Sequence, residues 1–117
     1  MGAPYIADFY QEVRLAPILT TLSFITIDSH STVDIDDAIH VEKVANGWKL
    51  SVAIADPSSV IPKGSEIEKE ALKRASSLYF PGQHISMLPE KIAADLCSLK
   101  EGALRLVKVV QMDVSET

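Results

Sequence analysis

Alternating apolar and polar positions in the middle of the chain predict a β-hairpin. Residues 38–45 and 48–55 read as its two strands, and Asn46-Gly47 between them is the preferred pair for the positive φ angles of a type I′ turn. Every second position of the second strand is large and apolar, namely Trp48, Leu50, Val52 and Ile54. Side chains two residues apart share one face of a strand, so one face of the hairpin is clearly the more apolar.

Further strands are predicted on both sides of this hairpin. Phe24–Asp28 is a short candidate before it, and residues 104–114 form a last one. The apolar even positions of the last strand are Leu104, Leu106, Val110, Met112 and Val114. Residues 1–23 read as a separate lead-in segment, and the main part of the domain spans residues 24–117. The lead-in has apolar residues at the spacing of a helix that Pro17 would stop, namely Ile6, Phe9, Tyr10 and Val13.

Two helices are expected between the hairpin and the last strand. Ser65 and Glu68 have the spacing of a capping box, and an apolar stripe then continues for about three turns. This stripe consists of Ile67, Ala71, Ala75 and Leu78. Pro81-Gly82 breaks the chain, and Pro89 suits the first turn of a shorter helix that continues to about Leu96. The order of elements predicts a mixed α/β (α+β) fold, with a largely antiparallel sheet and helices packed beside it.

The composition is typical of one soluble domain. With 117 residues, of which 47% are hydrophobic, the chain is too short for two packed domains and too apolar to stay disordered. A single cysteine, Cys97, excludes a disulfide framework and fits a reducing, cytoplasmic location. No apolar run has the length of a signal peptide or of a membrane-spanning helix, so no membrane partner is expected.

The negative charge of the chain is concentrated in one place. No Lys or Arg occurs from Leu15 to Glu42, yet this stretch contains four clustered aspartates: Asp28, Asp34, Asp36 and Asp37. If the loop after the first aspartate folds back, the carboxylates converge and repel one another unless a divalent cation lies among them. Mg²⁺, or Mn²⁺ in its place, prefers such oxygen ligands. Magnesium sites commonly combine one or two carboxylates with waters and a substrate phosphate, as in phosphodiester chemistry.

A solvated loop is the alternative explanation for the same aspartates. Asp, Ser and Thr are common in turns and at helix caps, where they need no metal. A calcium-binding EF-hand is disfavoured because the loop lacks the central glycine and the closing glutamate. The pattern alone therefore leaves a metal site and a solvated loop open.

Three stretches together resemble the RNB catalytic domain of the ribonuclease II and ribonuclease R family. They read FITIDSHSTVDIDDAIHVE, WKLSVAIADPSSVIPKGSEIEKEA and LYFPGQHISMLPEKIAADLCSL. The resemblance runs from about Phe24 to the end, and its details are closer to the ribonuclease II branch. It implies processive, Mg²⁺-dependent hydrolysis of single-stranded RNA in the 3′-to-5′ direction, with release of nucleoside 5′-monophosphates.

This resemblance also implies separate roles for the site residues. Asp28 and Asp37 match direct metal ligands. Asp36 matches the residue most needed for catalysis, which completes the metal site or positions the attacking water, and Asp34 supports it in the catalytic cluster. Tyr79 matches a tyrosine that contacts the 3′-terminal nucleotides of bound RNA. Without the resemblance, Tyr79 would be interpreted as a tyrosine closing the core at a helix end.

Length is the main departure from the family. Its members carry OB-type domains before a much longer RNB domain and an S1 domain after it, and these parts supply most of the RNA channel. The chain is therefore expected to be the N-terminal part of an RNB domain. One hypothesis is that it is the metal-binding part of an exoribonuclease whose partners are single-stranded RNA and the rest of the enzyme. The other is that it is an inactive fragment acting as a non-catalytic metal- or RNA-binding module.

Overall fold

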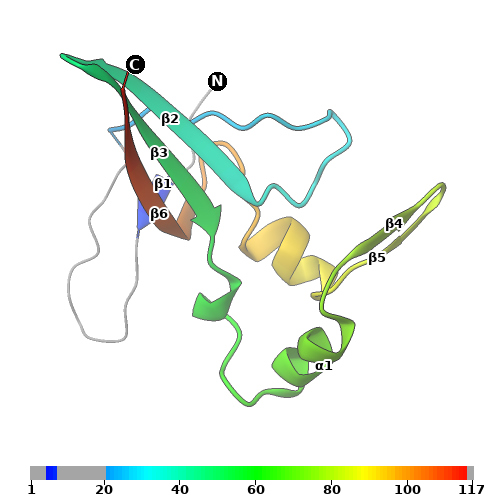
Figure 1. Ribbon diagram of the computed structural model, residues 1–117. Helices are drawn as coiled ribbons and strands as arrows, with labels where there is room; N and C mark the ends of the chain where they lie inside the picture. Colours follow the sequence, from blue (N-terminus) through cyan, green and yellow to red (C-terminus); the bar gives the residue numbers. More distant parts are fainter. Residues whose placement is uncertain (1–4, 8–20, 116–117) are drawn as a thin grey trace.

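A four-stranded sheet dominates the computed structural model, which describes residues 5–7 and 21–115 (Figure 1). The strand order is β1-β6-β3-β2. These strands are β1 (Tyr5–Ala7), β2 (Asp37–Val44), β3 (Gly47–Ala55) and β6 (Leu104–Ser115). β3 pairs antiparallel with both β2 and β6, whereas β1 runs parallel to the start of β6. A largely antiparallel sheet with helices beside it is the predicted α+β fold.

The predicted hairpin is confirmed as β2 and β3, but its turn lies one residue earlier than expected. Val44 faces Gly47 in the strand register, so the two-residue loop is Ala45-Asn46. Gly47 has a φ of 143° and neither loop residue has a positive φ, so the predicted type I′ turn at Asn46-Gly47 is wrong. A Cβ atom on Gly47 would lie 2.0 Å from the carbonyl oxygen of Val114. The close approach of β6, rather than turn geometry, requires this glycine.

The core forms on the face of the sheet that carries small residues. Ala38 and Ala53 are 1% and 0% exposed and lie in one cluster with Phe24, Leu99 and Val107. Because alanine leaves room above the sheet, larger side chains from the neighbouring segments can pack closely against it. The more apolar face of the hairpin lies on the other side, where the described residues leave several side chains exposed: Trp48, Ile54, Val110, Met112 and Val114.

The segments before β2 form less regular structure than predicted. In the expected strand Phe24–Asp28, only Ile25 pairs with the sheet, through two backbone hydrogen bonds of 2.8 and 2.9 Å to Ile39. Tyr5–Ala7 form β1, so the helix predicted for the lead-in is wrong at these residues. Hydrogen bonding along β6 stabilises a strand there despite the helical spacing of apolar residues. The rest of that predicted helix, in residues 8–20, lies outside the described residues.

Helix α1 (Glu66–Arg74) begins as the capping box predicts. The Ser65 hydroxyl accepts a hydrogen bond of 3.2 Å from the Glu68 backbone N–H, and the Glu68 carboxylate accepts one from the Gly64 N–H. The helix ends earlier than the apolar stripe suggests, because Ala75 takes a left-handed conformation with a φ of 60°. α1 has no buried residue, so all of its side chains stay at least partly exposed in the described part of the chain.

A second hairpin follows α1 where only a chain break was predicted. β4 (Leu78–Phe80) and β5 (Gln83–Ile85) pair antiparallel across Pro81-Gly82 and project away from the sheet in Figure 1. Gly82 supplies the positive φ, 77°, that this turn needs. The chain then enters η2 (Lys91–Leu96), which confirms the short helix predicted after Pro89.

A one-turn helix, η1 (Pro57–Ser59), follows β3. Its cap is Asp56, which is buried and whose carboxylate accepts a 3.1 Å hydrogen bond from the Ser58 N–H. None of the helices in the described part of the chain is long and apolar enough to cross a membrane.

Candidate active site at the aspartate segment

Residues 28–37, here called the aspartate segment, connect the Ile25 pairing to β2. Ser29 and Thr32 close a turn through a backbone hydrogen bond of 3.0 Å and a hydroxyl contact of 3.0 Å. Further along, the Asp36 carbonyl accepts a hydrogen bond of 2.8 Å from the Ala55 N–H at the end of β3. The segment therefore turns once and is then attached to the sheet.

Two of the predicted site residues, Asp34 and Asp36, line one pocket of about 240 Å³. Ile35 between them packs against the hydrophobic core instead. Ile35 is half-buried against the core, while the carboxylates on either side of it lie at the wall of the pocket. The end of β3 and residues 86–88 form other parts of its wall.

Tyr79 reaches the same pocket from the β4–β5 hairpin. Its hydroxyl donates a hydrogen bond of 2.9 Å to Oδ2 of Asp34, across 45 residues of sequence. This hydrogen bond to a carboxylate raises the pKa of Tyr79, because loss of the phenol proton would place two negative charges together. The structure thus brings the predicted RNA-contacting ring to the predicted catalytic carboxylates.

Asp28 and Asp37 are exposed, and neither lines this pocket. Their charges nevertheless act on Asp36. Partial burial, and then the charges of Asp34, Asp37 and Asp28, raise the pKa of the Asp36 carboxyl. All four aspartates therefore belong to one electrostatic cluster.

The donor chemistry of this cluster suits a hard divalent cation. Among the residues that the structure describes, no three His, Cys, Asp or Glu side chains are arranged to enclose a metal ion. Mg²⁺ does not require such a cage, because it is usually held by one or two carboxylates together with waters and phosphate oxygens. Asp34 and Asp36 at a pocket, with two more carboxylates close enough to act on their charge, fit that mode of binding.

His84 is a site residue that sequence reasoning missed. Its ring stacks on the Tyr79 ring with a centroid distance of 4.5 Å and an interplanar angle of 10°. The two residues face each other across β4 and β5, so the pairing becomes visible only once the second hairpin is known. Tyr79 remains 66% exposed, which leaves much of the ring available to a ligand.

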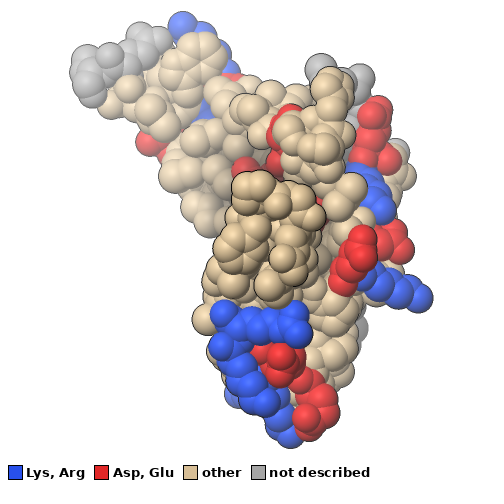
Figure 2. All heavy atoms as spheres, turned by 90° about the vertical axis from the view of Figure 1, so that its right-hand side faces the viewer, with Lys and Arg blue, Asp and Glu red and all other residues tan. Residues whose placement is uncertain are grey.

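The face that carries the second hairpin is divided by charge. Figure 2 shows Lys, Arg, Asp and Glu side chains gathered over α1 at the lower end of this face and along its right-hand edge, around a central area that is mostly without them. The hairpin contributes large exposed apolar and aromatic side chains to that face, namely Leu78, Tyr79, Phe80 and Ile85. A ligand that approaches Tyr79 therefore contacts an aromatic and apolar surface rather than a cationic one.

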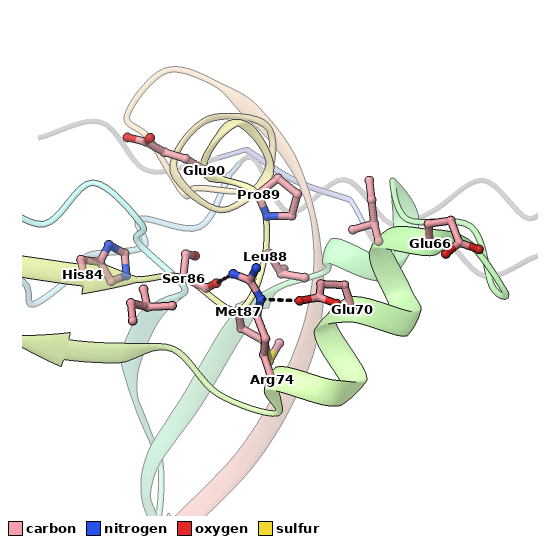
Figure 3. A pocket seen from close by; sticks show the side chains of 11 residues that line it. Glu66, Glu70, Arg74, His84, Ser86, Met87, Leu88, Pro89 and Glu90 are labelled. Carbon is pink, nitrogen blue, oxygen red and sulfur yellow. Dashed lines mark hydrogen bonds and ion pairs between the residues drawn. The ribbon is translucent and has the colours of Figure 1, made fainter.

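A larger pocket, about 530 Å³, lies between α1 and residues 84–90 (Figure 3). The Arg74 guanidinium donates hydrogen bonds of 3.1 Å to the Glu70 carboxylate and 2.8 Å to the Ser86 carbonyl. These contacts satisfy Arg74 and join α1 to the chain after β5. The pocket contains none of the four aspartates.

The raised pKa of Asp36 predicts an effect of pH on stability. A carboxyl with a higher pKa in the folded than in the unfolded chain binds its proton more tightly when folded, so its ionisation opposes folding as the pH rises. Without divalent cations, Asp36→Asn should raise the free energy of unfolding at about pH 7 by less than about 1 kcal/mol, because solvent screens these charges. The difference should shrink below the ordinary value of 3.8, where the carboxyl is protonated in both states. Urea unfolding at both pH values measures it, and a loss of stability at neutral pH would contradict the prediction.

Comparisons with known sequences point to one family. Residues 18–117 match the RNB domain. Exoribonuclease 2 of Aeromonas hydrophila subsp. hydrophila is 45% identical over 98 residues, which cover 84% of this chain and 15% of the relative. Exoribonuclease 2 of Klebsiella pneumoniae is 49% identical over 98 residues, covering 83% and 15%. The chain thus spans 15% of the length of these curated relatives.

Solved structures show the same relationship. Mycoplasma genitalium RNase R in complex with ribose methylated single-stranded RNA matches with a TM-score of 0.79 and 40% identity, over 83% of this chain and 15% of that chain. The same protein in complex with double-stranded RNA matches with a TM-score of 0.80 and 40% identity, over 83% and 17%. The predicted resemblance is confirmed. Since the family match covers most of the chain and the relatives are well above 30% identical, this chain belongs to the RNB domain family.

Proposed function

We propose that this chain carries the acidic part of the catalytic site of a 3′-to-5′ exoribonuclease. The enzyme would hydrolyse single-stranded RNA processively to nucleoside 5′-monophosphates, with Mg²⁺ or Mn²⁺. The observation that carries the proposal is the Tyr79 hydroxyl on the Asp34 carboxylate, in a pocket that Asp36 also lines. Carboxylates that can bind a metal ion and an aromatic ring that can stack on a nucleobase then lie at one site, in a chain of the RNB domain family.

The aspartates would hold and use the cation. Asp28, Asp36 and Asp37 are the proposed metal ligands. A bound divalent cation supplies positive charge at the scissile phosphate and lowers the pKa of a bound water. Asp36 would also accept a hydrogen bond from the attacking water and so orient it toward the scissile phosphate.

Tyr79 would hold the 3′-terminal nucleotide over these carboxylates. Stacking of a base on an aromatic side chain contributes about 1–3 kcal/mol and tolerates any base. The hydrogen bond to Asp34 fixes the direction of the Tyr79 ring, which reduces the entropy lost on binding. The remainder of a full-length enzyme, with OB- and S1-type domains, would supply the rest of the RNA channel.

The proposal is tested by incubating the full chain with single-stranded RNA labelled at the 3′ end or the 5′ end, with Mg²⁺ or EDTA. We expect a 3′ label to be released as a mononucleotide only in Mg²⁺. A 5′ label should pass from full-length RNA to a short end product without intermediate lengths, as processive degradation requires. Early internal fragments would contradict an exonuclease. RNA binding without hydrolysis would favour the non-catalytic module instead.

Binding of the same RNA, measured by fluorescence anisotropy in Ca²⁺ or EDTA, tests the role of Tyr79. Tyr79→Ala should weaken binding by roughly 5- to 160-fold, which corresponds to the loss of one stacked base at about 1–3 kcal/mol. Tyr79→Phe is the matched control, because it keeps the ring and removes only the hydroxyl bonded to Asp34. Equal affinities for Tyr79→Ala and the unchanged chain would contradict the stacking role.

A further inference from the structure

The backbone of the aspartate segment is held by a buried serine from a distant part of the chain. The Ser98 hydroxyl donates a hydrogen bond of 2.7 Å to the Val33 carbonyl and accepts one of 3.1 Å from the Ile35 N–H. The neighbouring Leu99 N–H donates a bond of 2.9 Å to the Ile35 carbonyl. Three hydrogen bonds therefore hold the backbone on both sides of Asp34, and none of them involves the Asp34 carboxylate.

This contact lies inside the protein. Ser98 is 0% exposed and Leu99 is 1% exposed, and Leu99 belongs to the hydrophobic core. A buried backbone group that loses its partner costs about 1–3 kcal/mol, so the hydroxyl strongly favours one conformation of residues 33–35. In that conformation Ile35 packs inward, while Asp34 and Asp36 face the pocket.

We propose that Ser98 is a positioning residue, which acts through the backbone to set where the Asp34 and Asp36 carboxylates point. The inference rests on the proposed function, because it assigns Ser98 to the same site. Without the hydroxyl, the Val33 carbonyl and the Ile35 N–H would seek other partners and the segment would shift. The carboxylates would then no longer lie at the places where a cation and Tyr79 meet them.

A purely structural role for Ser98 is separated from positioning by a matched control, Ser51. Ser51 is also buried, at 1% exposure, and its hydroxyl accepts a hydrogen bond of 3.1 Å from the Gln111 side chain. It lies in β3, opposite His40 of β2 and Gln111 of β6 in the strand register, and therefore away from the aspartate segment. If lost stability alone weakens cation binding, Ser51→Ala and Ser98→Ala should both bind the cation more weakly. If positioning matters, only Ser98→Ala should.

The experiment compares the full chain with Ser98→Ala, Ser98→Thr and Ser51→Ala. Mn²⁺ affinity is measured by electron paramagnetic resonance without RNA. We expect Ser98→Ala to weaken Mn²⁺ binding about 10-fold or more, the range typical when a group that orients metal ligands is removed. Ser51→Ala should stay within about 2-fold, and Ser98→Thr, which keeps the hydroxyl, should recover most of the affinity. Ser98→Cys replaces Ser98→Ala if the latter does not fold, because the thiol keeps a weak donor and acceptor where alanine has neither.

A second readout needs no metal. NMR signals of the Tyr79 ring and hydrogen exchange at the Ile35 amide report the segment directly. Ser98→Ala should shift the Tyr79 ring signals and speed hydrogen exchange at the Ile35 amide, whereas Ser51→Ala should change neither. Wild-type Mn²⁺ affinity in Ser98→Ala would overturn the proposal. If the unchanged chain binds no Mn²⁺, the proposed metal site is wrong, and the role of Ser98 is then tested by the NMR signals of the Tyr79 ring alone. A shift of these signals in Ser98→Ala but not in Ser51→Ala supports positioning, and no shift overturns it.

Discussion

Asp36→Asn should abolish Mg²⁺-dependent RNA hydrolysis while the chain stays folded. Asparagine keeps the shape of the side chain and removes the negative charge that a cation and the attacking water require. A cation in phosphodiester hydrolysis supplies several kcal/mol of transition-state stabilisation, so we expect the rate to fall at least about 100-fold. The release of a 3′ label from single-stranded RNA measures the rate, and calorimetric titration with Mg²⁺ measures the binding that should weaken with it.

Asp113→Asn is the matched control for this substitution. Asp113 is exposed on β6, opposite Lys49 in the register, and lies outside the pocket of Asp34 and Asp36. It undergoes the same chemical change and should leave hydrolysis within about 2-fold, as expected for a surface charge away from the site. Asp36→Asn should be at least as stable as the unchanged chain at neutral pH without metal, and urea unfolding in the assay buffer checks that lost activity is not lost folding. Hydrolysis that survives Asp36→Asn would disprove the catalytic assignment.

Among glycine-to-alanine substitutions at the glycines that the structure describes, Gly47→Ala should cause the largest loss of stability. The new Cβ would lie 2.0 Å from the Val114 carbonyl oxygen and 3.1 Å from the Ser115 Cα, so backbone must move. The φ of 143° adds strain for any L side chain. Together these effects should lower the free energy of unfolding by about 3 kcal/mol. Urea unfolding followed by Trp48 fluorescence and by circular dichroism measures the loss.

Gly64→Ala provides the comparison at a glycine with space around it. Gly64 has a φ of 80°, and a Cβ there would meet no atom within 4 Å. The left-handed backbone conformation is then the only source of strain, and it should lower the free energy of unfolding by about 1–2 kcal/mol. If both variants lose the same stability, the contact between β3 and β6 is not what requires Gly47.

Local patterns in the sequence predicted the elements that depend on local interactions. Alternation placed β2 and β3, the Ser65 and Glu68 spacing placed the start of α1, and residues 104–114 became β6. The resemblance to the RNB family was confirmed, and it selected Asp34, Asp36 and Tyr79, which the structure brings together. Roles for the four aspartates and the identity of the cation stay predictions.

Contacts between distant segments explain where prediction failed. The Asn46-Gly47 pair suggested a type I′ turn, but the approach of Val114 on β6 accounts for the glycine. The spacing of Leu78 suggested a longer helix, but the left-handed Ala75 ends α1 and frees the residue for β4. Val114 lies 67 residues from Gly47, outside any local pattern. Ile85, which faces Leu78 in the second hairpin, is only seven residues away, and this pairing was missed because Pro81-Gly82 was interpreted as a chain break.

The sequence by itself therefore determined the hairpin, the capped helix, the last strand and the set of acidic residues, because strand alternation, capping and charge are properties of neighbouring residues. Only the tertiary structure decided which face of the sheet is buried, since Ala53 admits Phe24 and Leu99 where larger side chains would not. It also decided that Tyr79 meets Asp34 and that Ser98 holds the backbone beside it, because these hydrogen bonds join residues 45 to 65 positions apart.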